Sequence, residues 1–458
     1  RDYSLASPRR PSYIVQAETA TEVSAIVRLA NENKVPLIPA SSAVHFHGCT
    51  IPRYGGIVLD LTRMNRILEF DEPNRKVKVE PGVTWADLQS YLKERGHMMI
   101  SPLMPHASRS PLTDYLEREV PVIPVYEFGE PLLSMEIVWP NGDTFRSGTA
   151  SAPNYPQSFA EGANPHGPGP LNYHRLLEGA QGTIGIVTWA NMKMEFLPTI
   201  NKVFFMPFGT LADAIEPMYR IQRLKLGYEC LLLNNINLAT IFTEEWPKDF
   251  ESLRVALPPW TLILILSGGP RRPEEKIAYE ERALMQIGKE LPHMNILTAL
   301  PGAPGVERKL TAMLREPWPR EKVYWKHAWK GNCQDLFFIT RPEMAPGFLS
   351  VVGDVAASHG YPVSDIGCYL QPIENARACH LEFNFYYDSE SPKERARILR
   401  LHSEAAQVAL SRDGFFARPY GGIADLVYSK TTDYTTLLRT VKNIFDPNNI
   451  MNPGNLCF

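Results

Sequence analysis

One stretch constrains the fold of this chain more than any other: an apolar segment that runs into a loop of small residues and is followed by a second apolar segment. Residues 35–40 are typical of a buried strand, residues 41–50 of a loop, and residues 55–60 of the start of another strand. Small side chains let backbone N–H groups approach a phosphate closely. Many surface loops have this composition, so the loop by itself predicts only a candidate pyrophosphate cradle.

The segments before this loop predict a strand–helix–strand unit. Residues 13–15 form a short apolar run, and Thr19 with Glu22 has the spacing of a capping box at the start of a helix that ends near Asn33. The loop then follows the second strand of the unit. Ligands favour that end of strands in α/β units, so this position supports a binding role.

Three further patterns follow in the first half of the chain. Thr84 is placed to cap a helix, and residues 133–139 and 143–146 read as two strands joined by a Pro-Asn-Gly turn. Glycines at residues 179–185 lead into a β-branched strand. Residues 147–170 are rich in Gly, Pro, Ser and Asn, which leaves a lid, an interaction surface and a flexible connection as alternatives.

From about Lys202 the pattern changes to alternating strands and helices. Two copies of a strand–helix–strand pattern are expected, at residues 228–266 and 337–385, followed by a long helix at residues 393–411. We therefore expect this part of the chain to form a separate α+β domain.

Composition limits the classes of function. The 458 residues are too many for one core, and 47 Lys and Arg against 50 Asp and Glu give no basic field for nucleic acid or an anionic membrane. No apolar run is long enough to span a bilayer. The six cysteines lack C-x-x-C spacing, which argues against a zinc site, an iron–sulfur cluster or a disulfide scaffold. A cytoplasmic protein is expected, with a removed leader as the alternative because the chain starts at Arg1.

Four segments together resemble the FAD-binding oxidoreductases of the vanillyl-alcohol oxidase / p-cresol methylhydroxylase family. They are residues 36–60, residues 79–83, Gln181-Gly-Thr-Ile-Gly-Ile-Val-Thr188 and Phe445-Asp-Pro-Asn-Asn-Ile-Met-Asn-Pro-Gly454. The resemblance implies a two-lobed FAD-binding domain over residues 1–200, an α+β substrate (cap) domain over residues 201–425, and a C-terminal segment that returns to the FAD domain.

The resemblance also narrows the branch of the family. Residues 116–148 resemble the vanillyl-alcohol oxidase and cresol group. The related D-lactate and glycolate dehydrogenases usually carry the metal motifs His-x-Gly-x-Gly-Asn and Gly-Glu-His-Gly, and neither occurs here. His380-x-Glu382-x-Asn384 supplies too few ligands for that site, so no metal is expected.

FAD is the implied cofactor, although the first loop has Ser41, Ser42 and Ala43 where the family has glycines. His45 and His47 do not align with the residue that tethers flavin in some relatives, so we expect non-covalent FAD. The residues implied to bind FAD are Ala40, Ser41, Ser42, Ala43, Val44, His45, His47, Gly48, Pro102, Ser108, Ser110, Gly182, Gly185, Ile186, Val187, Arg418 and Asn452.

The candidates for chemistry are Arg418, His106, His380, Glu382 and Tyr420. By resemblance, Arg418 lies near the flavin and stabilises the reduced ring; the alternative is an arginine packed on Asp425 or a surface carboxylate. His106 lies by resemblance near the reactive flavin edge, where a histidine can act as a base; the alternative is a histidine bonded to the backbone of its proline-rich loop. His380 and Glu382 alternate along a strand and so share a face, either as an acid–base pair or as a satisfied polar pair. Tyr369 and Arg377 are candidates for substrate binding.

Two classes of function remain open. The first is an FAD-dependent dehydrogenase or oxidase that takes a hydride from a para-substituted phenol or aromatic alcohol, with a D-2-hydroxy acid as the alternative substrate. Its electrons would pass to oxygen or to a partner such as an electron-transfer flavoprotein, a cytochrome or an iron–sulfur subunit. The second is a non-catalytic, electron-relay flavoprotein subunit of a complex. In either class we expect a homo-oligomer or a part of a complex.

Overall fold

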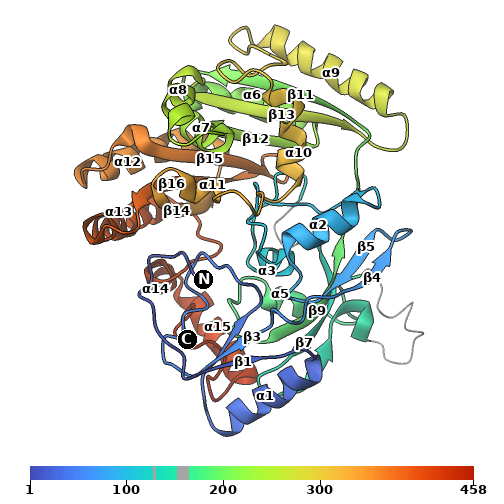
Figure 1. Cartoon of the computed structure of the whole chain (residues 1–458), viewed down its shortest axis with the longest axis vertical. Helices are drawn as coiled ribbons and strands as arrows, with labels where there is room; N and C mark the ends of the chain where they lie inside the picture. The colour runs from blue at the N-terminus through green and yellow to red at the C-terminus, as the bar shows by residue number, and fades with distance from the viewer. Residues whose placement is uncertain (127–129, 152–163) are drawn as a thin grey trace.

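The computed structural model describes residues 1–126, 130–151 and 164–458. Figure 1 shows two lobes, one built on a six-stranded sheet and the other on two smaller sheets, with the last helices packed beside the N-terminal segment. Half of the Gly-, Pro-, Ser- and Asn-rich stretch at residues 147–170, namely residues 152–163, lies outside the described residues.

The first small sheet carries the loop on which the sequence analysis centred. Its order is β1-β3-β2, all parallel, with β1 at Tyr13–Gln16, β2 at Leu37–Ala40 and β3 at Ile57–Asp60. Helix α1 (Ala20–Glu32) connects β1 to β2, and Thr19 and Glu22 form the expected capping box. The strand–helix–strand prediction is confirmed, except that β3 lies between the two strands.

The second small sheet is antiparallel, in the order β4-β5-β9-β7-β8. The expected hairpin is present as β7 and β8, and the glycines near residue 180 lead into β9 as predicted. The elements of this region are β4 (Ile67–Asp71), β5 (Lys76–Val79), α2 (Trp85–Lys93), β6 (His97–Met98), α3 (Pro111–Leu116), β7 (Leu132–Val138), β8 (Thr144–Arg146), α5 (Tyr173–Leu177), β9 (Ile186–Lys193) and β10 (Glu195–Phe196).

The large sheet is antiparallel and has the order β11-β13-β12-β15-β16-β14. Two halves meet where β12 pairs with β15: the second has the order β-α-β-β-α, and the first has the same order with two helices inserted between its last two strands. The repeat is therefore longer than the strand–helix–strand pattern expected from the sequence, and its first copy begins with β11. The strands are β11 (Ile200–Phe208), β12 (Glu229–Asn234), β13 (Trp260–Gly268), β14 (Gly331–Thr340), β15 (Ile366–Ile373) and β16 (Ala378–Asp388).

Helices cover both faces of this sheet because successive strand residues point to opposite sides. One face packs on α6 (Leu211–Arg223), α9 (Pro273–Glu290), α12 (Ala345–Ser358) and α13 (Pro392–Ser411). The other packs on α7 (Asn235–Phe242), α8 (Lys248–Ala256), α10 (Leu310–Arg315) and α11 (Trp325–Ala328), and its core also takes in Ile100, Met104 and Ile123 of the other lobe. That second face therefore looks across the junction of the lobes.

The C-terminal segment returns to the first lobe through α14 (Gly422–Lys430) and α15 (Thr432–Phe445). Its tail lies beside β2, where the Leu37 N–H donates to the Ile450 carbonyl and the Asn452 N–H donates to the Leu37 carbonyl. The tail is thereby fixed next to the loop that follows β2.

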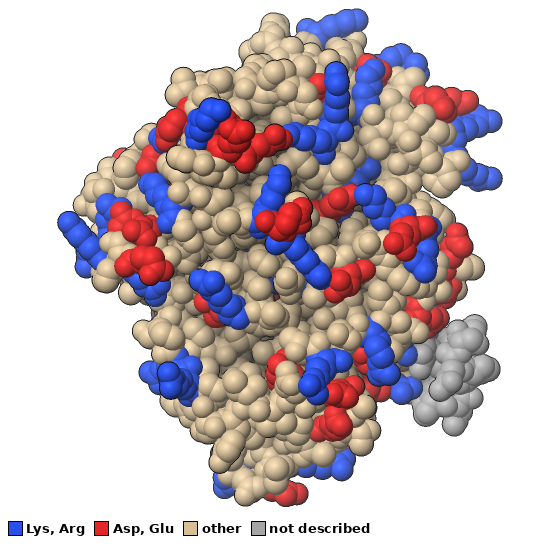
Figure 2. All heavy atoms as spheres, in the orientation of Figure 1, with Lys and Arg blue, Asp and Glu red and all other residues tan. Residues whose placement is uncertain are grey.

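The molecular surface carries charges of both signs. Figure 2 shows Lys and Arg interspersed with Asp and Glu over the visible face. Within residues 1–126, 130–151 and 164–458, no helix is long and apolar enough to cross a membrane.

Candidate active site

A cavity in the first lobe, here called the cofactor cavity, brings together the four segments that carried the family resemblance. Ser41 and His45 come from the loop after β2, Pro81 from the turn after β5, Gly182 from the glycine segment before β9, and Asn452 from the tail. Gly185, Ile186 and Val187 also line it, as expected. Segments far apart in sequence thus meet around one space.

Two residues of this cavity depend on their local geometry. Gly182 has φ +73°, and a Cβ there would lie 2.6 Å from Cγ of Pro39, so only glycine allows the segment to pass β2 this closely. The Asn452 side-chain amide donates to the carbonyls of Cys49 and Gln181, at 2.9 and 2.7 Å. Its buried Oδ1 has no partner. A buried acceptor facing a cavity suits a polar ligand such as FAD.

The loop after β2 differs from the expected cradle. The His45 N–H donates to the Arg1 carbonyl and the Gly48 N–H to the Asp2 carboxylate, so the N-terminal segment takes two of the donors expected for the pyrophosphate. The His45 ring bonds to the Ser42 carbonyl at 2.7 Å, and burial lowers the pKa of His45 to about 4. Six of the positions in and beside this loop that were implied to bind FAD do not line the cavity: Ala40, Ser42, Ala43, Val44, His47 and Gly48.

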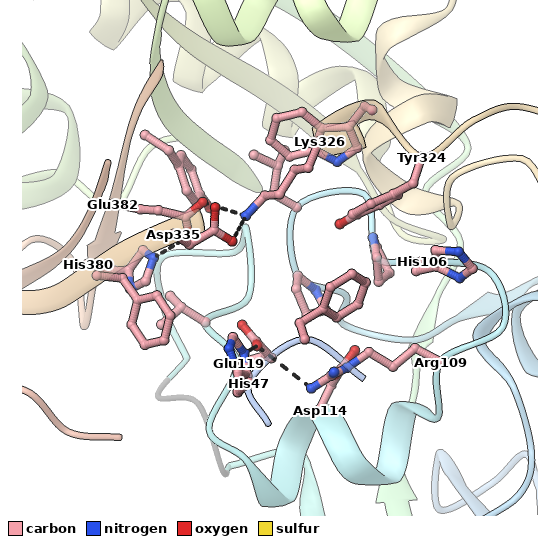
Figure 3. A pocket seen from close by; sticks show the side chains of 18 of the residues that line it. His47, His106, Arg109, Asp114, Glu119, Tyr324, Lys326, Asp335, His380 and Glu382 are labelled. Atoms are coloured by element: carbon pink, nitrogen blue, oxygen red, sulfur yellow. Dashed lines mark hydrogen bonds and ion pairs between the residues drawn. The ribbon is translucent and has the colours of Figure 1, made fainter. Parts of the chain in front are cut away.

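A second cavity, here called the reaction pocket, lies between the lobes (Figure 3). The first lobe contributes His106, Arg109, Asp114 and Glu119 to its lining. The sheet lobe contributes Lys326 from α11, Asp335 from β14, and His380 and Glu382 from β16. The segment around α3 reaches both cavities, because Thr113 and Glu117 line the cofactor cavity while Asp114 and Glu119 line the pocket.

The first charged group of the pocket, here called the Lys326 group, comes from the lobe of the six-stranded sheet and is centred on Lys326. Its Nζ lies 2.6 Å from Oδ2 of Asp335 and 2.6 Å from Oε1 of Glu382, and Oε2 of Glu382 accepts from Nε2 of His380 at 3.2 Å. Burial raises the pKa of Asp335, and the neighbouring Glu382 adds to this effect against the pull of Lys326. Burial acts in the same direction on Glu382, but Lys326 and His380 outweigh it and hold that pKa well below its usual range.

The second charged group of the pocket, here called the Arg109 group, pairs two arginines with three carboxylates. Arg418 lies 2.5 Å from Glu119 and stacks on the Phe337 ring, while Arg109 bonds to Asp114 and lies 2.9 Å from Glu117. Burial alone would raise the pKa of Glu119, but the two arginines and His47 hold it well below its usual range.

His106 and the aromatic candidates line or adjoin the pocket. Nδ1 of His106 accepts from the Ser108 N–H at 3.1 Å, so the neutral ring carries its proton on Nε2 and offers a donor rather than the expected base. Burial and Arg109 lower the pKa of His106, which favours this neutral form. Tyr369 lines the pocket, and Tyr420 stacks on His47, with ring centroids 4.2 Å apart.

Four residues that the sequence analysis named as site candidates lie outside the cofactor cavity. Arg377 follows a turn between β15 and β16, its side chain is 82% exposed beside Glu374, and it lines neither cavity. Pro102 lines the reaction pocket instead of the cofactor cavity. Ser108 binds His106 through its N–H, and Ser110 caps α3.

Several charged residues that define the pocket were not predicted from the sequence, above all Lys326, Asp335, Arg109 and Glu119. No local motif marks Lys326. Asp335 lies opposite Asn384 on β16. Its proximity to Glu382 follows only from the register of these two strands, which the sequence does not give. The described residues contain no group of histidine, cysteine and acidic side chains suited to a metal ion.

Comparisons with known proteins identify two domains in this chain. Residues 11–107 match the FAD binding domain model, and residues 376–456 match the model of the C-terminal domain of FAD linked oxidases. Together with the fold, these matches define the class of the protein: it is an FAD-linked oxidoreductase, with FAD as its cofactor. Its relatives include the 4-cresol dehydrogenase flavoprotein subunit and D-lactate and glycolate dehydrogenases.

Individual relatives are distant but extend over nearly the whole chain. The 4-cresol dehydrogenase [hydroxylating] flavoprotein subunit of Pseudomonas putida is 24% identical over 97% of this chain and 87% of its own length. Mitochondrial D-lactate dehydrogenase [cytochrome] of Arabidopsis thaliana is 24% identical, over 97% and 73%.

Solved structures share the fold at lower identity. A substrate-bound p-cresol methylhydroxylase has a TM-score of 0.79 at 20% identity, covering 97% of this chain and 88% of that one. The 4-ethylphenol oxidase of Gulosibacter chungangensis has a TM-score of 0.82 at 19% identity, covering 99% and 90%. The expected α+β fold of the vanillyl-alcohol oxidase type is therefore confirmed.

Proposed function

We propose that the protein oxidises a small neutral aromatic compound, a para-substituted phenol or an aromatic alcohol, by hydride transfer to FAD. One observation carries this choice: each Lys or Arg that lines the described reaction pocket is already bound to a carboxylate. Lys326 is shared by two carboxylates, Arg418 pairs with Glu119, and Arg109 pairs with Asp114.

This charge pattern disfavours a 2-hydroxy acid. Such a substrate carries a carboxylate near neutral pH, and burying it requires a cation to pair with it. Here an incoming carboxylate would have to displace Glu119, Asp335 or another buried acid, which would leave that acid unpaired. A neutral phenol or alcohol avoids this cost.

The remaining lining suits an aromatic ring. Phe46, Phe337, Tyr324 and Tyr369 border the pocket, and their faces and edges pack favourably against another ring. The Lys326 group and the Arg109 group provide polar partners at opposite sides of the pocket for a substrate with a polar group.

When bound, FAD would supply the hydride acceptor. Among the side chains, we assign proton transfer to His380. Because its Nε2–H donates to Glu382, Nδ1 is the ring nitrogen left to accept the substrate hydroxyl proton, and Glu382 then stabilises the imidazolium. Arg418 forms a neutral pair with Glu119, so its part is to fix the wall of the pocket, and it stabilises negative charge less than an unpaired arginine would.

Anaerobic reduction of the bound flavin tests this proposal. 4-Methylphenol or 4-hydroxybenzyl alcohol is expected to bleach the flavin absorbance, whereas D-lactate and glycolate are not. Bleaching by the hydroxy acids alone would refute the substrate class in favour of the hydroxy-acid alternative. Bleaching by none of them, together with reduction by a partner protein, would favour the electron-relay function. Oxygen, a cytochrome and other protein acceptors are then compared as oxidants of the reduced protein.

A further inference from the structure

A third cavity, here called the outer cavity, lies beside the reaction pocket. It is bordered by residues 4–6, by β14, by α13 and by the segment that leads into α14. Leu399 of α13 and Gly422 at the start of α14 line it and are exposed, Leu399 to 54%. The outer cavity therefore opens to solvent between these two helices.

The outer cavity and the reaction pocket share a wall. Phe46, His47, Asp335, Phe337 and Arg418 line both spaces. The Phe337 ring lies under the Arg418 guanidinium, 4.1 Å from its centroid, and meets the His47 ring edge-on at 5.6 Å. A few stacked side chains thus stand between the solvent-facing cavity and the pocket, and side-chain rotation is fast compared with turnover.

The lining of the outer cavity suits the same kind of molecule as the pocket. Leu5, Leu399, Phe416 and Ile423 supply apolar surface. His402, also in the lining, donates to the Asp335 carbonyl at 3.0 Å, and burial lowers its pKa to about 4, so it is uncharged near neutral pH. A neutral aromatic molecule can pass along this surface without the energetic cost that a charged molecule would meet on leaving water.

We propose that the outer cavity is the route by which substrate reaches the reaction pocket, with the stacked Phe337 and Arg418 side chains as the gate. The proposal rests on the proposed function for the chemistry of the substrate, although the position of the route does not depend on it. The gate would open by rotation of Phe337 away from Arg418, whose guanidinium stays held by Glu119.

Gly422 allows a sharp test. A Cβ at this position would meet no atom within 4 Å, and Gly422 lacks the positive φ that strains a substitution, so Gly422→Phe adds bulk at the mouth of the outer cavity without a backbone penalty. Gly347 in α12 is a matched control, since it is also a helical glycine with open space around its Cβ and lies outside this lining. Leu399→Trp narrows the same mouth from the α13 side.

The measurement is stopped-flow reduction of the FAD-loaded protein by 4-methylphenol over a range of concentrations. In Gly422→Phe and Leu399→Trp the second-order rate constant is expected to fall about tenfold to a hundredfold, within the range over which association rates vary among variants. The limiting rate at saturation should match the wild-type value, and Gly347→Phe should match it in both constants. Unchanged second-order constants in both mouth variants overturn the route, as does an equal fall in both constants.

The route and the substrate class can fail separately. If D-lactate reduces the wild-type flavin and phenols do not, the substrate class is wrong and the same variants are compared with D-lactate. If neither compound reduces it, the association rate of 4-methylphenol is followed through the shift it causes in flavin absorbance. A rate that is equal in the wild type and both mouth variants then overturns the route, and so does a wild-type flavin that shows no such shift.

Discussion

Replacing Lys326 by methionine removes the single cation shared by two buried carboxylates. Its Nζ lies 2.6 Å from both Asp335 and Glu382, in a side chain only 15% exposed. Breaking a buried ion pair from one side costs about 3–5 kcal/mol of folding free energy because a charge is left uncompensated. The protein can escape this cost only by protonating one carboxylate in the folded state, so the loss of stability must depend on pH.

The sign of that dependence follows from the direction of the pKa change. Burial already raises the pKa of Asp335, and loss of Lys326 raises it further. A carboxyl whose folded pKa exceeds its unfolded value has no penalty below the unfolded pKa, and stability is lost as the pH rises through the folded pKa. One pKa unit is worth about 1.4 kcal/mol, so we expect Lys326→Met to cost about 3–5 kcal/mol near pH 8 and only about 1.5 kcal/mol near pH 5.

Urea unfolding of the FAD-free protein, followed by tryptophan fluorescence at both pH values, measures this difference. Lys330→Met is the matched control: Lys330 lies 2.8 Å from Asp365, but Arg254 also pairs with that carboxylate at 2.7 Å, so a loss of about 0–1 kcal/mol with little pH dependence is expected. Adding Asp335→Asn to Lys326→Met should restore part of the stability near pH 8. A Lys326→Met protein as stable as the wild type near pH 8, or equally destabilised at both pH values, would refute the reasoning.

Three further predictions concern cofactor retention and proton transfer. Gly182→Ala should lower the FAD content per chain and cost about 1–3 kcal/mol of stability, whereas Gly360→Ala, at a similar φ of +67° with open space around its Cβ, should keep its FAD. Asn452→Ala should weaken FAD binding by about 1–3 kcal/mol in a fluorescence titration, because two carbonyls lose their donor; wild-type affinity would contradict this. His380→Gln should slow flavin reduction by substrate about a hundredfold or more, because no ring nitrogen is left to accept the hydroxyl proton. Glu382→Gln should also slow it, since the imidazolium formed on His380 loses its carboxylate partner. A wild-type reduction rate in His380→Gln would exclude His380 as the base.

Local patterns predicted the parts of the fold that depend on neighbouring residues. The capping box at Thr19, the hairpin of β7 and β8, and the alternation that brings His380 and Glu382 onto one face of β16 are all visible within a few residues of sequence. Each depends on spacing along the chain, which the sequence gives directly.

The errors arose where distant segments or irregular backbone decide. Lys326 and Asp335 come from different elements, and only the packing of α11 beside β14 brings them together. Arg377 points to solvent because Glu374, Asn375 and Ala376 before it all have positive φ, a turn that no glycine announces. The N-terminal residues that occupy the loop after β2 were likewise invisible from the loop sequence itself.

The two charged groups of the reaction pocket share one balance of charges, and this balance affects where a released proton can go. Each group contains one more carboxylate than cations, and in each the surplus is relieved in one place. Burial raises the pKa of Asp335 and, beside Arg109, raises that of Asp114 to about 6, whereas Glu382 and Glu119 are held well below their usual range.

Carboxylates whose pKa values are pushed apart in this way take different roles, since the one with the raised pKa accepts a proton more readily while the other stays ionised. Oxidation of a hydroxyl group in the reaction pocket would release a proton beside these carboxylates. Asp335 shares Lys326 with Glu382, and Glu382 bonds to His380, so a proton accepted by His380 enters a network whose surplus negative charge can hold it. The arrangement that disfavours an anionic substrate is thus the same one that favours taking a proton from a neutral one.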